Sequence, residues 1–304
     1  MKSIRLCIYV LAVSQALWPA VSQSAEPAIR PQISEEVSKQ ESIYHSQGQQ
    51  VPEGYTIDRA LEAYAAMLPP VFSDELAGLG PNDRWLDIGA GKGHAILGYY
   101  APSYDVAHWA GREKRGRKAR AVAMSIEDRR TPLWQQTAAG LGANQIQYLT
   151  NKRLREYSVE ELGRFKLITD VIGGFSYSVD LSLFMEKVLS FLEVNGSFHT
   201  VLQDVHSEAG SNVPFYANAP YLTEITNIDG SKEKVCSWLK SIGCVQVTCE
   251  LKTGWRPPIE AFHIQKVCNE VKVPALVPVH YQAGTPPERR YRKKGEVTVS
   301  PRKP

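Results

Sequence analysis

The stretch Arg84–Gly93 reads Arg-Trp-Leu-Asp-Ile-Gly-Ala-Gly-Lys-Gly, and it decides the fold of this chain. A short apolar run, interrupted by Asp87, leads into glycines at alternate positions, and the segment His94–Tyr100 that follows is compatible with a helix. This order predicts a strand, a tight turn and a helix, the first unit of a parallel α/β sheet. Glycine is needed where the backbone passes close to a ligand or adopts dihedral angles that a Cβ forbids. The N–H groups at the following helix start then point at whatever binds.

The spacing of the glycines distinguishes two kinds of nucleotide-binding turn. A dinucleotide site has the pattern G-x-G-x-x-G, and His94 stands where its last glycine would be. An acid at the end of the strand suits a cationic amine better than a pyrophosphate. The pattern D-x-G-x-G-x-G resembles motif I of the class I S-adenosylmethionine (SAM) methyltransferases. A glycine-rich turn of some other α/β protein is the alternative interpretation.

The resemblance implies contacts to SAM from the motif I turn. In that family the acid faces the amino group of the methionine, which assigns this role to Asp87. The turn itself accommodates the cofactor, which makes its residues cofactor-binding candidates: Gly89, Ala90, Gly91 and Gly93.

A second acid in the family, at the end of the second strand, accepts hydrogen bonds from the ribose hydroxyls. The segment Ala119–Ile126 alternates as a strand does, and Glu127 follows it directly, so Glu127 takes this role. Glu113 lies at the usual separation of about 20 residues from motif I, but it ends no strand. We therefore expect residues 101–118 to be an insertion. A solvated surface acid is the alternative for Glu127.

The resemblance extends to the next two strands. A strand over Gln145–Leu149 runs toward Asn151, the nearest amide to the place where the family contacts the adenine, and no acid occurs there. The strand Phe165–Ile172 and the loop Gly173–Tyr177 resemble motif IV, where an acid and the loop after it face the transferring methyl group. Asp170 is therefore expected to contact the cofactor and to form, with that loop, the floor of the acceptor pocket.

Methyl transfer from a sulfonium depends largely on holding the nucleophile in line with the methyl group. A general base helps where the acceptor is a hydroxyl or a neutral amine, and His206 is the candidate. A plain hydrophilic loop is its alternative. Asp204, His206 and Glu208 are metal-ligand types, but three residues of one peptide rarely close a site, so no metal is expected. His199 lies within a strand and is expected to be structural.

The remaining pattern completes the sheet. A helix over Asp180–Glu193 and a strand over Ser197–Gln203 are followed by a helix over Lys232–Ile242 and by strands over Cys244–Leu251 and Ile259–Val267. A final strand–turn–strand matches the antiparallel hairpin that ends the methyltransferase sheet. The predicted fold class is therefore α/β, a Rossmann-like doubly wound sheet of about seven strands with an antiparallel C-terminal hairpin, the class I methyltransferase fold.

The two last strands also predict which cysteines lie together. If they form an antiparallel hairpin centred near Trp255, the numbers of opposed residues sum to about 511. Cys244 and Cys268 are then near neighbours, whereas Cys249 faces Phe262 or His263 and has no cysteine opposite. A disulfide between Cys244 and Cys268 and a pair of buried thiols are both open.

Composition, together with the resemblance, divides the chain of 304 residues into four expected parts. Residues 1–24 have the layout of a signal peptide, residues 25–51 are a polar linker, residues 52–272 form the SAM-dependent methyltransferase-like domain, and residues 273–304 are a disordered basic tail. The net charge of +3 is concentrated in that tail, and the rest of the chain has no basic signature of a nucleic-acid enzyme. We therefore expect no nucleic-acid partner, and the oligomeric state stays open.

The signal peptide predicts an exported protein, periplasmic or secreted, with an uncleaved N-terminal anchor as the alternative. The first functional hypothesis is a SAM-dependent methyltransferase that binds SAM and acts on an unidentified acceptor, whether a small molecule, a lipid or a protein. The alternative is an exported methyltransferase-fold protein that binds SAM or a partner without turnover. A nicotinamide oxidoreductase ranks third, because His94 replaces the required glycine.

Overall fold

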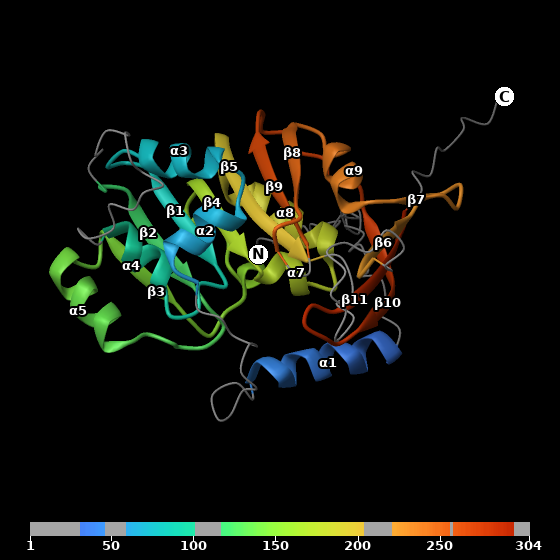
Figure 1. Ribbon diagram of the computed structural model, residues 1–304, viewed down its shortest axis with the longest axis horizontal. Coiled ribbons are helices and arrows are strands. Elements are labelled where there is room, and N and C mark those ends of the chain that lie inside the picture. Colours follow the sequence, from blue (N-terminus) through green and yellow to red (C-terminus); the bar gives the residue numbers. More distant parts are fainter. Residues whose placement is uncertain (1–30, 46–58, 101–116, 204–220, 256–257, 295–304) are drawn as a thin grey trace, which may run out of the picture.

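The computed structural model describes residues 31–45, 59–100, 117–203, 221–255 and 258–294 (Figure 1). The predicted signal peptide, the candidate base His206 and nearly all of the expected insertion lie outside these residues. In the described part of the chain, no helix is long and apolar enough to span a bilayer.

A seven-stranded sheet with the order β3-β2-β1-β4-β5-β9-β8 forms the centre of the molecule (Figure 1). The first five strands in this order are parallel, and β9 is antiparallel to both of its neighbours. The predicted fold class, with its antiparallel C-terminal hairpin, is therefore confirmed. The strands are β1 (Arg84–Ile88), β2 (Arg120–Met124), β3 (Ile146–Leu149), β4 (Phe165–Val171), β5 (Leu192–Gln203), β8 (Val245–Lys252) and β9 (Ile259–Lys266).

Helices cover both faces of this sheet, because its central strands are apolar on both sides. In β4, for example, every residue except Lys166 is buried. One layer contains α2 (Leu61–Met67), α3 (Val71–Gly78), α4 (His94–Tyr100) and α5 (Pro132–Leu141). The other layer contains η3 (Leu154–Glu156), α6 (Val159–Leu162), α7 (Gly174–Tyr177), α8 (Leu181–Phe191) and α9 (Val235–Lys240).

A second sheet shows that the prediction of a disordered C-terminal tail was wrong over most of its length. Its order is β10-β11-β6-β7, with β10 (Leu276–Gln282), β11 (Glu288–Lys293), β6 (Thr223–Thr226) and β7 (Lys232–Glu233). The tail is ordered because alternate residues of β11, Arg289 and Tyr291, point into the protein and are almost fully buried. Their outward neighbours are basic, and this gave the segment the composition of a solvated tail.

The predicted linker is also partly wrong, since Pro31–His45 form the helix α1. This helix lies beside β10 and β11 (Figure 1) and is fixed to the turn between them. The backbone N–H of Ala283 donates to Glu36 Oε2 over 2.7 Å, and that of Gly284 donates to Gln40 Oε1 over 2.8 Å. The composition therefore indicated neither α1 nor the second sheet on which α1 packs.

Several element boundaries differ from the prediction. The helix expected to reach Glu193 ends at Phe191, and β5 begins at the next residue, five residues before the predicted start. Asn195, two residues beyond the expected end of that helix, lies inside β5 with a positive φ of 62°. The motif IV loop is mostly helical, since Gly174–Tyr177 form α7. The helix expected from Lys232 starts at Val235, after the short strand β7.

The hairpin register is confirmed, because Val245 pairs with Lys266, and Cys249 with Phe262. A disulfide joins Cys244 to Cys268, whose Cα atoms are 5.1 Å apart, so the alternative of two separate thiols does not hold. A second disulfide joins Cys249 to Cys236 on α9, with the Cα atoms 6.2 Å apart. The strand register could not indicate this bond, because Cys236 lies outside the hairpin.

Candidate functional site

A cavity of about 1190 Å³ lies at the carboxyl ends of the parallel strands. Ile88, Met124 and Val171, the last residues of β1, β2 and β4, all line it. Ligands of open α/β sheets bind at this edge, and typical small-molecule pockets measure about 300–1,000 Å³. The cavity is therefore large enough for a nucleotide-sized cofactor together with a second molecule.

The glycine-rich turn supplies one wall of this cavity through Gly89, Ala90 and Gly91. Gly89 has a φ of 70°, and a Cβ placed on it would lie 3.1 Å from the Cα of Gly173 on the neighbouring strand end. Gly89 is thus required both by its backbone conformation and by the close approach of two loops.

Gly93, with a φ of 74°, has a different role from the glycine at position 89. A Cβ on Gly93 would collide with the indole ring of Trp134 on α5. Gly93 is not among the residues that line the cavity. This glycine lets α5 pack against the turn, and its predicted contact with the cofactor stays a prediction.

Asp87 is fully buried and is held by hydroxyl groups from two other elements. The Tyr64 hydroxyl donates to both carboxylate oxygens, at 2.9 and 3.0 Å, and the Thr169 hydroxyl donates to Oδ1 at 2.7 Å. Burial raises the pKa of Asp87 to about 7, although these hydrogen bonds oppose the shift. Asp87 does not line the cavity, but Tyr64 does. Asp87 therefore lies one hydrogen bond behind the cavity wall.

Asp170 is also fully buried, and its partners are backbone groups of its own loop. It accepts hydrogen bonds from the N–H of Gly173 at 2.7 Å and of Phe175 at 2.9 Å. Burial raises the pKa of Asp170 to about 7, against the effect of these two bonds. The carboxylate caps the start of α7, and the lining of the cavity comes from the loop it shapes, including Gly173, Gly174 and Tyr177.

The other end of α7 is held by side chains of the second sheet. The fully buried Arg289 donates from Nη1 to the carbonyl oxygens of Phe175 and Ser178, at 2.9 and 3.0 Å. The hydroxyl of Tyr281 donates to the carbonyl of Tyr177 at 3.0 Å. The carboxyl group at the start and the guanidinium at the end thus satisfy backbone groups that a helical turn leaves unpaired. We call Asp170, α7 and Arg289 the α7 clamp.

Glu127 lies on the cavity wall, in the loop after β2 where the sequence predicted it. Arg129 Nη2 lies 3.3 Å from its Oε2 and lines the same cavity. Asn151, the predicted adenine contact, does not line the cavity. It is exposed, has a φ of 64°, and its amide donates to Thr150. The lining residues next to it are Lys152, Arg153, Leu154 and Arg155.

Helix α1 forms a roof over part of the cavity through Val37, Gln40 and Glu41. Glu41 pairs with Arg153 on the opposite wall, with 2.7 Å between Oε1 and Nη1. Together with the bonds from Glu36 and Gln40 to the β10–β11 turn, this fixes both sides of the roof. Part of the cavity is thus covered by a segment that lies about 50 residues before motif I in the chain.

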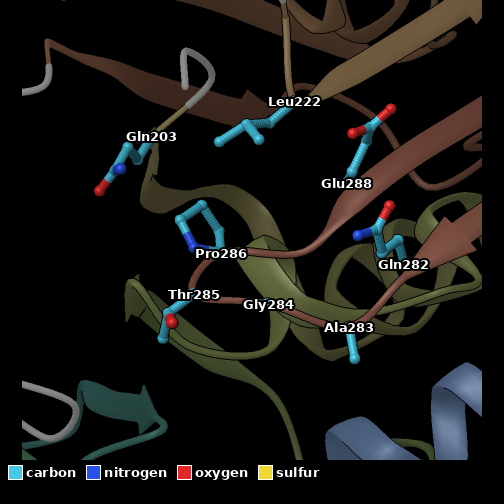
Figure 2. Close-up of a pocket in the computed structure, with 8 residues that line it drawn as sticks. All are labelled: Gln203, Leu222, Gln282, Ala283, Gly284, Thr285, Pro286 and Glu288. Carbon is cyan, nitrogen blue, oxygen red and sulfur yellow. The ribbon is translucent and has the colours of Figure 1, made fainter. Parts of the chain in front are cut away.

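A smaller cavity of about 320 Å³ lies at the end of β5, between that strand and the β10–β11 turn (Figure 2). Figure 2 shows Gln203, Leu222 and Glu288 on one side and the turn residues Ala283 to Pro286 on the other. It shares no lining residue with the large cavity. It also contains no residue that the sequence predicted for the site.

Comparison with known proteins gives likenesses of fold. No protein-family model and no curated protein sequence matches the chain. The strand order, with β9 inserted antiparallel between β5 and β8, is the feature that separates methyltransferases from plain dinucleotide-binding domains. This is the class I methyltransferase fold.

Solved structures with this methyltransferase fold are similar to the chain at low identity. A putative SAM-dependent methyltransferase from Listeria monocytogenes is 14% identical over 64% of this chain and 97% of its own, with a TM-score of 0.41. An rRNA methylase from Streptococcus thermophilus is 13% identical over 65% and 95%, with a TM-score of 0.39. A precorrin-6y C5,15-methyltransferase from Geobacter metallireducens is 11% identical over 71% and 93%, with a TM-score of 0.38. Likenesses this distant carry no argument about activity, and the fold assignment rests on the sheet.

The structure thus brings together part of the predicted site of this methyltransferase-like domain. Gly89, Ala90, Gly91 and Glu127 line one cavity, and Asp87 and Asp170 lie directly behind it. Sequence reasoning missed the residues that face the ligand space from other elements: Tyr64, the α1 roof, and the clamp through Arg289. The alternation in β11 was a signal for the last of these, whereas nothing local marked Tyr64.

Proposed function

We propose that the protein is a SAM-dependent methyltransferase. The observation that carries this proposal is the convergence of the positive-φ glycine turn and Glu127 on one cavity at the carboxyl ends of β1 and β2. Residues of both strand ends line a space large enough for a cofactor and an acceptor. SAM is a nucleoside that carries an amino-acid chain. A ligand can approach the backbone of the glycine turn closely, which suits the amino-acid end, and the acid at the next strand end suits the ribose.

SAM would supply a methyl group on a sulfonium, with a neutral thioether as the leaving group. Glu127 accepts hydrogen bonds from the ribose hydroxyls. The Gly89–Gly91 turn approaches the cofactor with backbone alone. Tyr64, anchored through Asp87, leaves its oxygen lone pairs for the amino group, so Asp87 acts through Tyr64 rather than by contact. The methyl side is bounded by Gly173, Gly174 and Tyr177 of the α7 clamp.

Binding of S-adenosylhomocysteine, measured by calorimetry, tests this proposal. Glu127→Ala should weaken binding by about 1–3 kcal/mol, because a charge-assisted hydrogen bond is lost. Asp128→Ala is the matched control, since this neighbouring acid is exposed, pairs with Arg130 and does not line the cavity. No binding by the wild-type protein, or equal effects of the two variants, would overturn the proposal.

A second candidate is a protein that binds SAM or a partner without turnover. It is favoured by the absence of a histidine among the described residues that line the cavity, and by the engagement of both buried acids inside the protein. Incubation with radiolabelled SAM and separate small-molecule, lipid and protein pools distinguishes the two functions. Cofactor binding with no label in any pool supports the second, and label in one pool identifies the acceptor class.

Export of the chain belongs to the same proposal. It is supported by the signal-peptide layout of residues 1–24 and by the two disulfides, which persist in oxidising compartments. Fractionation of cells expressing the full chain, with N-terminal sequencing of the product, tests it. A product retained in the cytosol with an intact N-terminus would refute export.

A further inference from the structure

Glu75, His199 and His263 form a cluster on the α3 side of the sheet, separate from the large cavity. His199 on β5 and His263 on β9 are directly opposed in the strand register. Their rings are nearly parallel, at 12°, with centroids 4.7 Å apart. Both turn their Nε2 atoms toward the carboxylate of Glu75 on α3, at 2.6 Å for His199 and 3.3 Å for His263.

We propose that these three side chains bind a divalent transition-metal ion of the zinc class. One ligand atom from each residue lies within 4.8 Å of the others. Bonds of about 2.0–2.1 Å in a tetrahedral zinc site place neighbouring ligand atoms about 3.3–3.4 Å apart. The His263–Glu75 contact already has this spacing. The His199–Glu75 contact has to lengthen by less than about 1 Å, which rotation of a glutamate side chain provides.

The ligand types and their exposure define the metal and its coordination. Two imidazole nitrogens with one carboxylate select zinc, copper or nickel over magnesium and calcium. His199 is fully buried and anchors the site, whereas the side chains of Glu75 and His263 are 25% and 15% exposed and leave a path for the ion. A fourth position stays open for water. Ser197 Oγ, which donates to Glu75 over 2.8 Å, orients the carboxylate.

One missing outer contact limits the affinity of this site. His199 Nδ1 is buried and has no hydrogen-bond partner in the described part of the chain. Loss of such an outer contact costs metal sites about 10–100-fold in affinity, so we expect micromolar rather than nanomolar binding.

The same groups without a metal form a hydrogen-bonded network: His199 Nε2 bonds to Glu75, and His263 Nε2 lies 3.1 Å from Ser197 Oγ and 3.3 Å from Glu75. The two arrangements differ in what they do to α3. A bound ion cross-links α3 to the β5–β9 pair, next to the hairpin that the Cys244–Cys268 disulfide already closes. Binding to the folded state alone raises its stability by mass action, and the network does not respond to added metal.

Calorimetric titration of the chelator-treated, oxidised full chain with zinc chloride tests the proposal. We expect one zinc ion per chain, and a loss of more than about 100-fold in affinity for His263→Ala and for Glu75→Gln. His280→Ala is the control, because His280 is 40% exposed on β10 and belongs to no such cluster among the described residues. The four cysteines of the described chain are in disulfides and do not compete as thiolates.

The thermal midpoint gives a second readout that a folding defect cannot imitate. Zinc should raise it in the wild type and in His280→Ala, but not in Glu75→Gln, which retains a side chain able to accept hydrogen bonds. Magnesium chloride should have no effect on any of them. Absence of zinc binding by the wild type, or equal zinc responses of wild type and Glu75→Gln, would show that the cluster is a hydrogen-bonded network only. These outcomes are independent of SAM binding and leave the proposed methyltransferase function untouched.

Discussion

Two buried aspartates lie at the ends of β1 and β4. Burial shifts their pKa values alike, but different groups bind their carboxyl oxygens. The pKa of each is raised to about 7 by burial. Asp87 is bound by hydroxyl groups, from Tyr64 on α2 and Thr169 on β4. Asp170 is bound by backbone N–H groups of the loop that follows it.

This difference determines what each acid contributes to the cavity. Hydroxyl groups both donate and accept, so the Asp87 side can rearrange its hydrogen bonds when the charge changes. Backbone N–H groups only donate, so the Asp170 side requires an acceptor at all times. Asp87 connects separate elements and presents Tyr64, whereas Asp170 fixes the shape of one short loop. The rigid region is thus the α7 side of the cavity, which we propose as the methyl side, and the adaptable region is the Tyr64 side, which we propose as the amino side.

Removal of Arg289 should break the rigid side most severely. Arg289→Ala leaves the buried carbonyl group of Phe175 and the partly buried one of Ser178 without this donor and opens a cavity under the second sheet. We expect a loss of about 3 kcal/mol in the free energy of unfolding, measured by urea denaturation. The control is Arg292→Ala on the same strand, whose side chain is exposed, with a change within about 0.5 kcal/mol. Equal effects of the two variants would show that the α7 clamp is not held from this side.

Neutral isosteres at the two acids test the comparison directly. In Asp170→Asn, the new amide group must face one of two backbone N–H donors, so the variant should lose about 2 kcal/mol of stability. In Asp87→Asn, the Tyr64 hydroxyl can reverse and accept from the amide, so the loss should be about 1 kcal/mol or less. Urea denaturation of both variants at one pH gives the two numbers. A larger loss for Asp87→Asn would reverse our assignment of the rigid side.

The difference between local and distant contacts explains what could be predicted from the sequence. The strand β1, its turn and α4 follow from a local pattern of apolar residues and glycines, and the alternation of later segments predicts the other strands of the main sheet. The contacts that define the site are not local. Asp87 meets Tyr64 across 23 residues, and Arg289 meets Phe175 across 114, and no periodicity within a segment encodes such a meeting.

The prediction for the C-terminal strands was wrong for an additional reason. One of the two partners of β11 is β6, more than 60 residues earlier in the chain, and the basic outward residues outweighed the alternation of Arg289 and Tyr291. The apolar residues between Leu276 and Tyr281 were a usable signal for β10. Glu127 lies on the cavity wall because a strand end fixes the edge on which its loop emerges, and its contact with the ribose stays a prediction. Asn151 has a positive φ, and the residues after it line the cavity instead, so its contact with the adenine also stays a prediction.

The dependence of stability on pH sharpens the comparison of the two acids. A carboxyl group whose pKa is raised from 3.8 to about 7 on folding keeps its proton in the folded state while the unfolded chain has lost it. Stability is therefore greatest below about pH 4 from this source and falls as the pH rises toward 7, by up to about 1.4 kcal/mol per pH unit for each acid. Asp87→Asn should remove the contribution of Asp87 to the slope of stability against pH between pH 5 and 7. Urea denaturation at several pH values measures this slope. A slope identical to the wild type would mean that Asp87 is already ionised in this range.

The smallest expected effect concerns backbone strain at the edge of the rigid side. Ile172, directly after β4, lines the cavity with a φ of 56°, a region that a β-branched residue enters at a cost of about 1–2 kcal/mol. Ile172→Gly relieves this strain but loses the contacts of a half-buried side chain, so the change in the free energy of unfolding should stay within about 1 kcal/mol of zero.

Ile126→Gly is the matched control, because Ile126 follows β2, lines the same cavity, is half-buried, and is not among the residues with positive φ. It should be destabilised by about 1 kcal/mol more than Ile172→Gly, since it loses the side chain and gains backbone freedom without any relief of strain. If urea denaturation gave equal losses for the two variants, Ile172 would carry no strain in solution, and the rigidity of the methyl side would rest on the α7 clamp alone.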